Sequence, residues 1–307
     1  MVSVIEAGDL VFSTILNPGR FSETNVLLLT ESIRAFAGSL SGAPIWCFVP
    51  EYGEQPSEVA MERLQALDVS LIPFEMDREV AEFPFTSEAC AAALAESRGL
   101  GDVNFLVWLN GNTLLLREPR AFLLPEGKSL GYRPVHHINV GSRLDDPLDP
   151  FWTQVYRLCG VPEYAVFPMR THVDGETIRP YFNAGFHVTR PIRGLLRAWR
   201  DTFLGVYEES DLQDLYQQDR RYTIFLHQAV LSGVIMSTLE FDEIQELPGE
   251  YNYPIHLYDD DITDNRPATI EELVAIRHEG FYGDPGWREK MPAGEPLKQW
   301  IAQRLLQ

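Results

Sequence analysis

Short apolar runs alternate with helix-like segments between residues 10 and 109, and this alternation limits the possible folds more than any other feature. Four runs have the length and composition of buried strands, namely residues 10–15, 43–49, 69–73 and 105–109. Helices are expected between them at residues 23–37, 56–67 and 87–98. Because parallel strands need a long crossover to return the chain, this order predicts βαβ units. We therefore expect an α/β fold with a mixed, mostly parallel central sheet flanked by helices.

The second half of the chain is less regular, but it contains no linker that would separate a further domain. We expect a strand at residues 128–133, a helix at 151–159, a hairpin around 173–176 and a strand within 179–189. Ser22 is a candidate N-cap for the helix at 23–37. The sequence shows no internal repeat and no low-complexity segment. The prediction is one continuous domain over residues 1–307.

Composition and charge restrict the partners of the protein. Of its 307 residues, 45% are hydrophobic, and the formal net charge is −20. Nucleic acids and anionic membranes need a basic face, so we expect neither as a partner. No segment reaches the ~20 apolar residues of a membrane span, and the N-terminus lacks the regions of a signal peptide. Cys47, Cys90 and Cys159 are odd in number and widely spaced, which favours reduced thiols and a cytoplasmic location.

The strand at residues 105–109 ends in a small polar group. Asn110 and Asn112 flank Gly111 directly after this apolar run. Ligands of open α/β sheets bind just beyond the carboxyl ends of the strands. These two asparagines are therefore candidate ligand-binding residues.

The segment that contains them, Trp108 to Pro119, reads WLNGNTLLLREP. It resembles the WLDxDTLVLREP segment of glycosyltransferases with the GT-A fold, in particular the lipopolysaccharide galactosyltransferase and glycogenin-like group. In that family the Asp-x-Asp carboxylates bind Mg²⁺ or Mn²⁺, and the ion binds the nucleotide diphosphate. Asn110 and Asn112 stand at the two Asp positions, so the resemblance comes with a degenerate motif.

A second resemblance lies in Tyr181 to Thr189, which is similar to the YFNAGVLLI strand of the family. The resemblance implies that Asn183 and Gly185 approach the donor sugar. An amide side chain supplies both a donor and an acceptor to sugar hydroxyls, and a glycine permits close contact with the backbone. The alternative is that both residues only shape a bulge in the strand.

The expected helix at residues 222–235 resembles the DQxxLN helix of the family. Gln228 matches the family's Gln, which in retaining members lies near the anomeric carbon and implies a catalytic role. His227 stands in place of the Asp that supports the donor sugar. Its near-neutral titration would suit an acid, and the alternative is a helix histidine bonded to the backbone.

Two further segments resemble loops that close over the donor in the family. Residues 246–254 resemble LPxxYNY, which implies that Asn252 contacts the donor, although the segment is also a plausible proline-bracketed turn. Residues 275–287 resemble IIHYxGxxKPW, in which the His is the third metal ligand and the loop wraps the diphosphate. The matching residues are His278, Gly280 and Trp287. The family's Lys is missing, and Arg277 or Arg288 is a candidate substitute.

The asparagines make a metal cofactor doubtful. Mg²⁺ and Mn²⁺ favour charged oxygen ligands, whereas Asn110 and Asn112 offer neutral ones. An ion would then bind together with the nucleotide, through His278. Alternatively, arginines neutralise the diphosphate without metal, or catalysis is lost. The candidate arginines are Arg20, Arg133, Arg143 and Arg170. The run Asp259 to Asp261 is interpreted as a solvated acidic loop and not as a metal site.

The resemblance predicts a retaining glycosyltransferase that moves a sugar from a nucleotide-diphosphate sugar, such as a UDP-sugar, to an unknown acceptor. Residues 10–125 would form the nucleotide-binding half, with the loop at 14–20 holding base and ribose, and residues 126–307 the sugar and acceptor half. The alternative is a catalytically weak or inactive sugar-nucleotide-binding protein of the same fold. A sugar-phosphate nucleotidyltransferase is disfavoured, because no Gly-rich, basic signature follows the first strand.

Overall fold

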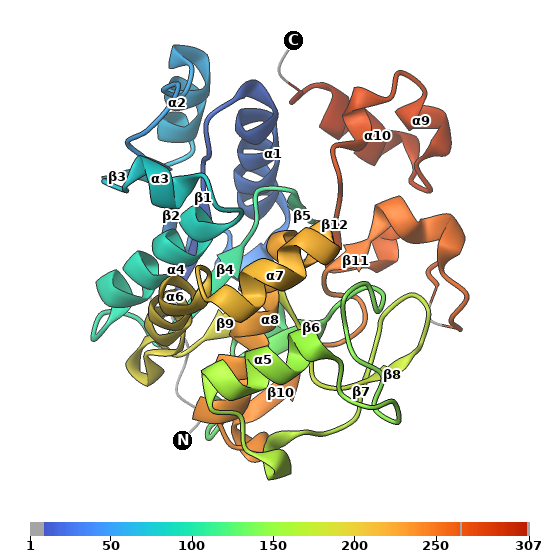
Figure 1. Cartoon of the computed structure of the whole chain (residues 1–307). Helices are drawn as coiled ribbons and strands as arrows, with labels where there is room; N and C mark the ends of the chain where they lie inside the picture. Colours follow the sequence, from blue (N-terminus) through green and yellow to red (C-terminus); the bar gives the residue numbers. More distant parts are fainter. Residues whose placement is uncertain (1–8, 265, 306–307) are drawn as a thin grey trace.

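A computed structural model describes residues 9–264 and 266–305, and a mixed sheet runs through its centre (Figure 1). Within these residues the sheet has seven strands in the order β10-β6-β9-β4-β1-β2-β3. The strands are β1 (Leu10–Ile15), β2 (Ile45–Pro50), β3 (Val69–Phe74), β4 (Phe105–Leu109), β6 (Leu130–Pro134), β9 (Phe182–Thr189) and β10 (Ile244–Glu246). Only β9 runs against its neighbours, since it pairs antiparallel with both β4 and β6. The predicted mixed, mostly parallel sheet is confirmed.

Helices cover both faces of this sheet, which explains why its central strand β4 is apolar and buried without interruption. On one face, α1 (Arg20–Phe36) and α2 (Glu58–Ala66) share a buried cluster with Phe12 and Val107. On the other face, Val11 and Leu106 belong to a core cluster that the sheet forms with a second group of helices. Those helices are α4 (Thr86–Gly99), α5 (Pro150–Cys159), α6 (Leu195–Val206), α7 (Ser210–Gln218) and α8 (Arg220–Thr238), with the short α3 (Arg78–Ala81) beside α4.

A smaller sheet places the C-terminal segment next to the end of β4. It consists of β11 (Tyr253–Pro254), β12 (Ala275–Arg277) and β5 (Thr113–Leu115). β5 begins directly after Asn112, and its antiparallel pairing with β12 sets Arg277 opposite Thr113. Helices α9 (Trp287–Lys290) and α10 (Glu295–Ala302) pack with this sheet around a third apolar cluster. This pairing brings two segments more than 160 residues apart in sequence to one place.

Local predictions were mostly confirmed, with two corrections. The hairpin forms between β7 (Met169–Arg170) and β8 (Thr177–Ile178). Ser22 is not an N-cap, because α1 begins at Arg20 after Gly19, whose φ of 112° suits only glycine. The acidic loop is not uniformly solvated. The Asp259 side chain is 98% exposed, whereas Asp261 is buried and accepts a hydrogen bond from the Tyr253 hydroxyl at 2.8 Å.

Two further expectations concern the cysteines and membrane-spanning helices. Cys47, Cys90 and Cys159 are all free thiols, and Cys47 is buried. In the part of the chain that the structure describes, none of the helices combines the length and apolarity needed to cross a bilayer.

Candidate active site

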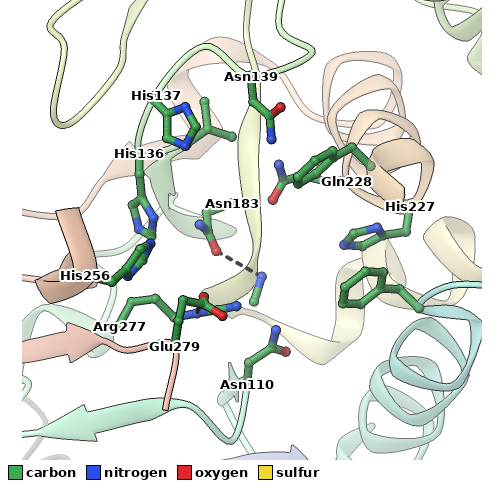
Figure 2. A pocket seen from close by; sticks show the side chains of 14 residues that line it. Asn110, His136, His137, Asn139, Asn183, His227, Gln228, His256, Arg277 and Glu279 are labelled. Atoms are coloured by element: carbon green, nitrogen blue, oxygen red, sulfur yellow. Dashed lines mark hydrogen bonds and ion pairs between the residues drawn. The ribbon is translucent and has the colours of Figure 1, made fainter. Parts of the chain in front are cut away.

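A cavity of about 190 Å³ opens at the carboxyl edge of the sheet (Figure 2). Among residues 9–264 and 266–305, its polar lining consists of four amides, four histidines, one arginine and one carboxylate. These are Asn110, Asn139, Asn183, Gln228, His136, His137, His227, His256, Arg277 and Glu279. They come from the ends of β4, β6 and β12, the start of β9, α8 and the segment after β11. The lining therefore suits a polar, hydroxyl-rich ligand better than an apolar one.

Gly185 on β9 allows two side chains to converge at the floor of the cavity. Its carbonyl accepts a hydrogen bond of 2.8 Å from the backbone N–H of Asn110, which fixes the end of β4. A Cβ atom at Gly185 would lie 2.5 Å from Asn110 Nδ2 and 2.8 Å from Arg277 Nη1. At such distances any side chain would displace one or both groups, so glycine permits their close approach.

Two amides present their NH₂ groups to the cavity because their oxygens are already used. Asn183 Oδ1 accepts from the Gly185 N–H at 3.1 Å, the bond drawn in Figure 2. Gln228 Oε1 accepts from the Ala184 N–H, also at 3.1 Å. A backbone N–H can bond only the amide oxygen, so these bonds fix both orientations. The cavity is consequently rich in hydrogen-bond donors.

Burial lowers the pKa of two of the cavity histidines, His227 and His136. His227 stacks on Phe85 with ring centroids 4.1 Å apart, and its Nδ1 lies 3.0 Å from the Ile224 carbonyl. Burial lowers the pKa of His227 to about 3. Burial likewise holds the pKa of His136 well below its usual value, and the Arg277 charge adds to this. The expected near-neutral titration of His227 is thus wrong, and the ring offers Nε2 as an acceptor instead of acting as an acid.

The other two residues of the expected metal site lie beside the cavity and do not line it. Asn112 Nδ2 is 3.4 Å from Glu279 Oε1, while its Oδ1 is buried and unpartnered within the described residues. The His278 N–H donates to the Asn112 carbonyl at 2.9 Å. The ring of His278 is fully buried, and its Nδ1 accepts from the Gly280 N–H at 3.2 Å. The structure therefore brings Asn112 and His278 together through the backbone, with only Asn110 facing the cavity.

Three further expected site residues have supporting positions. Asn252 is buried at a φ of 55°, and its carbonyl lies 3.1 Å from His136 Nε2. Trp287 is 8% exposed and packs in the C-terminal apolar cluster. Gly280, at a φ of 70°, leaves no room for a Cβ because the Phe21 ring lies against it. These residues shape the surroundings of the cavity and do not line it.

The sequence contained signals for three residues that were not selected, and for a second role of Arg277, which was considered only as a substitute for the family's Lys. His136, His137 and Asn139 follow β6 at its carboxyl end, as Asn110 follows β4. Arg277 precedes Gly280 by three residues, the spacing that separates His from Gly in the IIHYxG segment of the family. Alignment on this glycine places Arg277, and not His278, at the position of the family's histidine.

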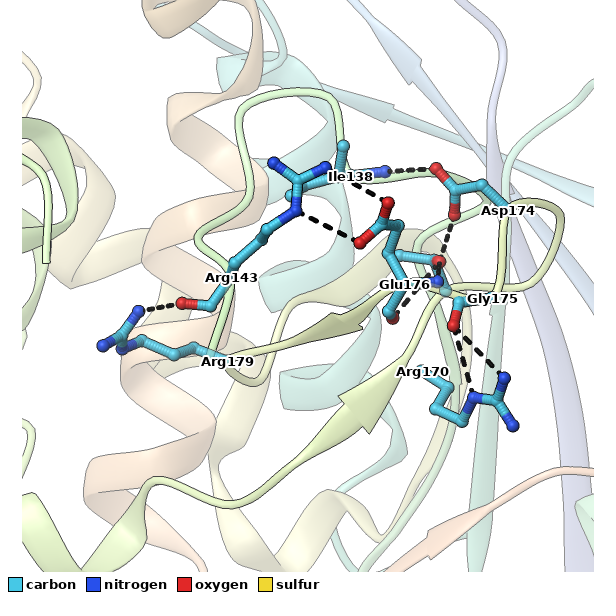
Figure 3. Close-up of polar contacts among 8 residues, drawn as sticks. Ile138, Arg143, Arg170, Asp174, Gly175, Glu176 and Arg179 are labelled. Atoms are coloured by element: carbon cyan, nitrogen blue, oxygen red, sulfur yellow. Dashed lines mark hydrogen bonds and ion pairs between the residues drawn. The ribbon is translucent and has the colours of Figure 1, made fainter. Parts of the chain in front are cut away.

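The other arginines considered for phosphate binding lie elsewhere. Arg143 pairs with Glu176 at 3.1 Å, and Arg170 bonds the Gly175 carbonyl, both at the β7–β8 hairpin (Figure 3). Arg133 lines a separate cavity of about 730 Å³. Arg20 is exposed in the first turn of α1 and does not line the cavity at the end of β4.

A divalent ion does not fit the residues at the end of β4. Considering the described residues alone, no group of three or more His, Cys, Asp or Glu side chains is arranged to hold an ion. Asn110 offers one neutral oxygen, and the neighbouring group is the Arg277 guanidinium. A fixed positive charge repels a metal ion at such a range, so the donor set disagrees with the Mg²⁺ or Mn²⁺ that the fold family implies.

A mostly parallel seven-stranded sheet with one antiparallel strand, together with a polar cavity at its carboxyl edge, is the arrangement expected of the GT-A fold. The comparisons agree. A structure of an active-site mutant of LgtC superimposes with a TM-score of 0.54 and 13% identity, covering 97% of this chain and 96% of that chain. The galactosyltransferase LgtC in complex with donor and acceptor sugar analogues superimposes with a TM-score of 0.52 and 14% identity, with the same coverage of both chains.

The family comparison is more specific. Residues 12–238, more than half of the chain, match the Rhodobacterales glycosyltransferase domain. The chain belongs to this family and is a glycosyltransferase. None of the curated proteins matches it.

Proposed function

We propose that the protein transfers a sugar from a nucleotide-diphosphate sugar, such as a UDP-sugar, to an acceptor, with retention of anomeric configuration. The observation that carries this proposal is the lining of the cavity by amides, imidazoles and one guanidinium at the carboxyl edge of the sheet. Amide and imidazole groups recognise sugar hydroxyls, whereas a guanidinium matches phosphate oxygens. The free thiols of the chain are consistent with action in the cytoplasm.

The two halves of the chain would divide the donor between them. Residues 10–125 would hold the nucleotide, with the loop at 14–20 against base and ribose. Residues 126–307 would hold the sugar and the acceptor. Asn112, Gly280 and His278 lie where the halves meet, next to Asn110. They would support the diphosphate end of the site.

Gln228 would act on the leaving group. Its oxygen is occupied by the Ala184 N–H, so its NH₂ is the part of the amide that faces the ligand. An N–H donor stabilises the negative charge that develops on the departing phosphate oxygen. His227, which is neutral, would accept a hydrogen bond from a sugar hydroxyl through Nε2. Asn183 would donate to another hydroxyl from the opposite wall.

The test is release of nucleoside diphosphate from a panel of UDP- and GDP-sugars, with the product anomer assigned by NMR. We expect one donor to be turned over, and Gln228→Ala to lower the rate constant about 100-fold, the typical loss of one such donor. Gln217→Ala, an exposed glutamine on α7, is the matched control and should leave the rate unchanged. No release from any donor, or an unchanged rate in Gln228→Ala, would contradict the proposal.

A further inference from the structure

The Arg277 guanidinium lies at the place where the family resemblance implies a metal ion. Both it and the Asn110 amide reach the same point above Gly185, within 2.8 Å of a Cβ built there. Asn110 stands at the first Asp position of the metal-binding motif, and Arg277 at the histidine position when the segments are aligned on Gly280. Figure 2 shows Arg277 extending from β12 toward Asn110 across the floor of the cavity. The cation and the degenerate motif are therefore adjacent in space.

Most of this guanidinium is available to a ligand. Arg277 Nε donates to Glu279 Oε1 at 3.3 Å. Neither Nη atom has a hydrogen-bond partner within residues 9–264 and 266–305. Glu279 Oε1 also accepts from Asn112 at 3.4 Å, so one carboxylate holds both side chains in place. The two Nη groups form a fork whose geometry matches two oxygens of a phosphate.

The electrostatics favour an anion over a cation at this point. Arg277 is largely buried, with 17% of its side chain exposed, whereas Glu279 is 54% exposed and its charge is better screened by water. Burial lowers the pKa of His136, His227 and His256, which disfavours a positive charge on these three rings. Arg277 is thus the strongest fixed charge that the described lining directs into the cavity.

We propose that Arg277 binds the donor diphosphate directly, together with the amide of Asn110, and replaces the divalent ion in neutralising its charge. This inference rests on the proposed function, because it assumes a diphosphate-bearing donor. It accounts for three departures of the sequence together. Two amides stand where the family has carboxylates, because no ion has to be bound. An arginine stands at the position of the family's histidine and supplies the positive charge of the ion.

The test is calorimetric titration of UDP and GDP into the full chain, in excess EDTA and again in excess MnCl₂. We expect one nucleotide to bind in EDTA, with a Kd that MnCl₂ changes by less than about twofold. Arg277→Gln should weaken binding about 100-fold, and Arg277→Lys about 10-fold, since lysine keeps the charge but loses the fork. Arg170→Gln, at an arginine outside the cavity, is the matched control and should change nothing. Thermal unfolding checks that each variant is folded.

The outcomes separate the two proposals. If UDP or GDP binds the wild-type chain only in MnCl₂, the role of Arg277 is wrong and the proposed function stands. Unchanged affinity of Arg277→Gln in EDTA also overturns the role of Arg277 alone. If neither nucleotide binds under either condition, both proposals fail. Should Arg277→Gln not fold, Arg277→Lys decides by the same criteria.

Discussion

Two buried arginines differ in how their hydrogen bonds are used. Arg133 on β6 has 6% of its side chain exposed, and its Nη1 donates to Glu246 Oε1 at 2.8 Å and to the Leu247 carbonyl at 2.6 Å. Its Nη2 lies 2.5 Å from His172 Nδ1. Arg277 on β12 bonds the protein only through Nε among the described residues. Burial lowers the pKa of both guanidinium groups, so the cost of desolvation is common to them and the partners differ.

This difference separates a structural cation from a binding one. A buried charge is tolerated when most of its N–H groups are satisfied by the protein, as at Arg133, where both Nη atoms have partners and only Nε has none among the described residues. At Arg277 the fork is unsatisfied by protein, and its desolvation is offset only when a ligand supplies the acceptors. Local violations of this kind are expected at functional sites. The comparison therefore predicts that removal of Arg133 costs more stability than removal of Arg277.

The largest expected effect on stability comes from Arg133→Met. Its removal leaves the Leu247 carbonyl and His172 without their partner. We expect the free energy of unfolding to fall by about 3 kcal/mol, at the lower end of the range for broken buried pairs because Glu246 is half-exposed. Urea denaturation measures it. Arg277→Met is the matched variant and should lose less than about 1 kcal/mol. Equal losses would erase the distinction between the two arginines.

A slightly smaller effect, on activity, is expected for Gly185→Ala. The new methyl group would overlap Asn110 Nδ2 and Arg277 Nη1, so the flexible ends of both side chains must move out of the cavity. We expect kcat/KM to fall about 50-fold, equivalent to about 2 kcal/mol, because both groups would contact the donor. Gly205→Ala on α6, where a Cβ meets nothing within 4 Å, is the control. An unchanged kcat/KM in Gly185→Ala would mean that Arg277 does not contact the donor.

His187 on β9 tests whether unsatisfied groups are simply tolerated in this core. It is 2% exposed, and neither ring nitrogen has a partner among the residues described. Burial lowers its pKa to about 3, so the unfolded chain binds a proton below its own pKa of about 6.5 while the folded chain does not. Stability is therefore lost as pH falls from about 6.5 toward 3, by up to about 1.4 kcal/mol per pH unit for this group.

His187→Leu should remove that dependence. We expect it to raise stability at pH 7 by about 1 kcal/mol and to reduce the slope of stability against pH between 6.5 and 5. Urea denaturation at several pH values measures both. A variant that is less stable at pH 7 would show that this buried ring makes a contribution that its unpaired nitrogens do not reveal.

Asn110→Asp should have a smaller effect than Gly185→Ala, and it should weaken donor binding and not restore a metal site. A carboxylate next to Arg277 would pair with it and occupy the fork. We expect UDP or GDP to bind about 10-fold more weakly in EDTA, equivalent to about 1.4 kcal/mol. Gln65→Glu, exposed on α2, makes the same change in net charge and is the control. Tighter binding that depends on Mn²⁺ would instead indicate that this end of β4 still accepts an ion.

The strands of the sheet were predictable because each one is a run of contiguous residues whose length and burial can be recognised from the sequence. The apolar run at 105–109 coincides with β4, and the run at 10–15 coincides with β1. The site was predictable only in part. Asn110, Asn183, Gly185, His227 and Gln228 line the cavity. The role of Arg277 depends on the β5–β12 pairing across more than 160 residues and on side-chain direction, neither of which local sequence determines.

The last prediction is that the affinity for the donor does not depend on pH in the neutral range. Arginine stays charged throughout the neutral range, and burial lowers the pKa of His136, His227 and His256. A sugar nucleotide keeps its diphosphate charge over this range. Its Kd should therefore change by less than about twofold between pH 6.5 and 8.5. If an imidazolium were the cation, affinity would instead weaken steadily as pH rises above about 6.5. Such a slope, measured by titration of the best-bound donor, would indicate that a histidine and not Arg277 binds the diphosphate.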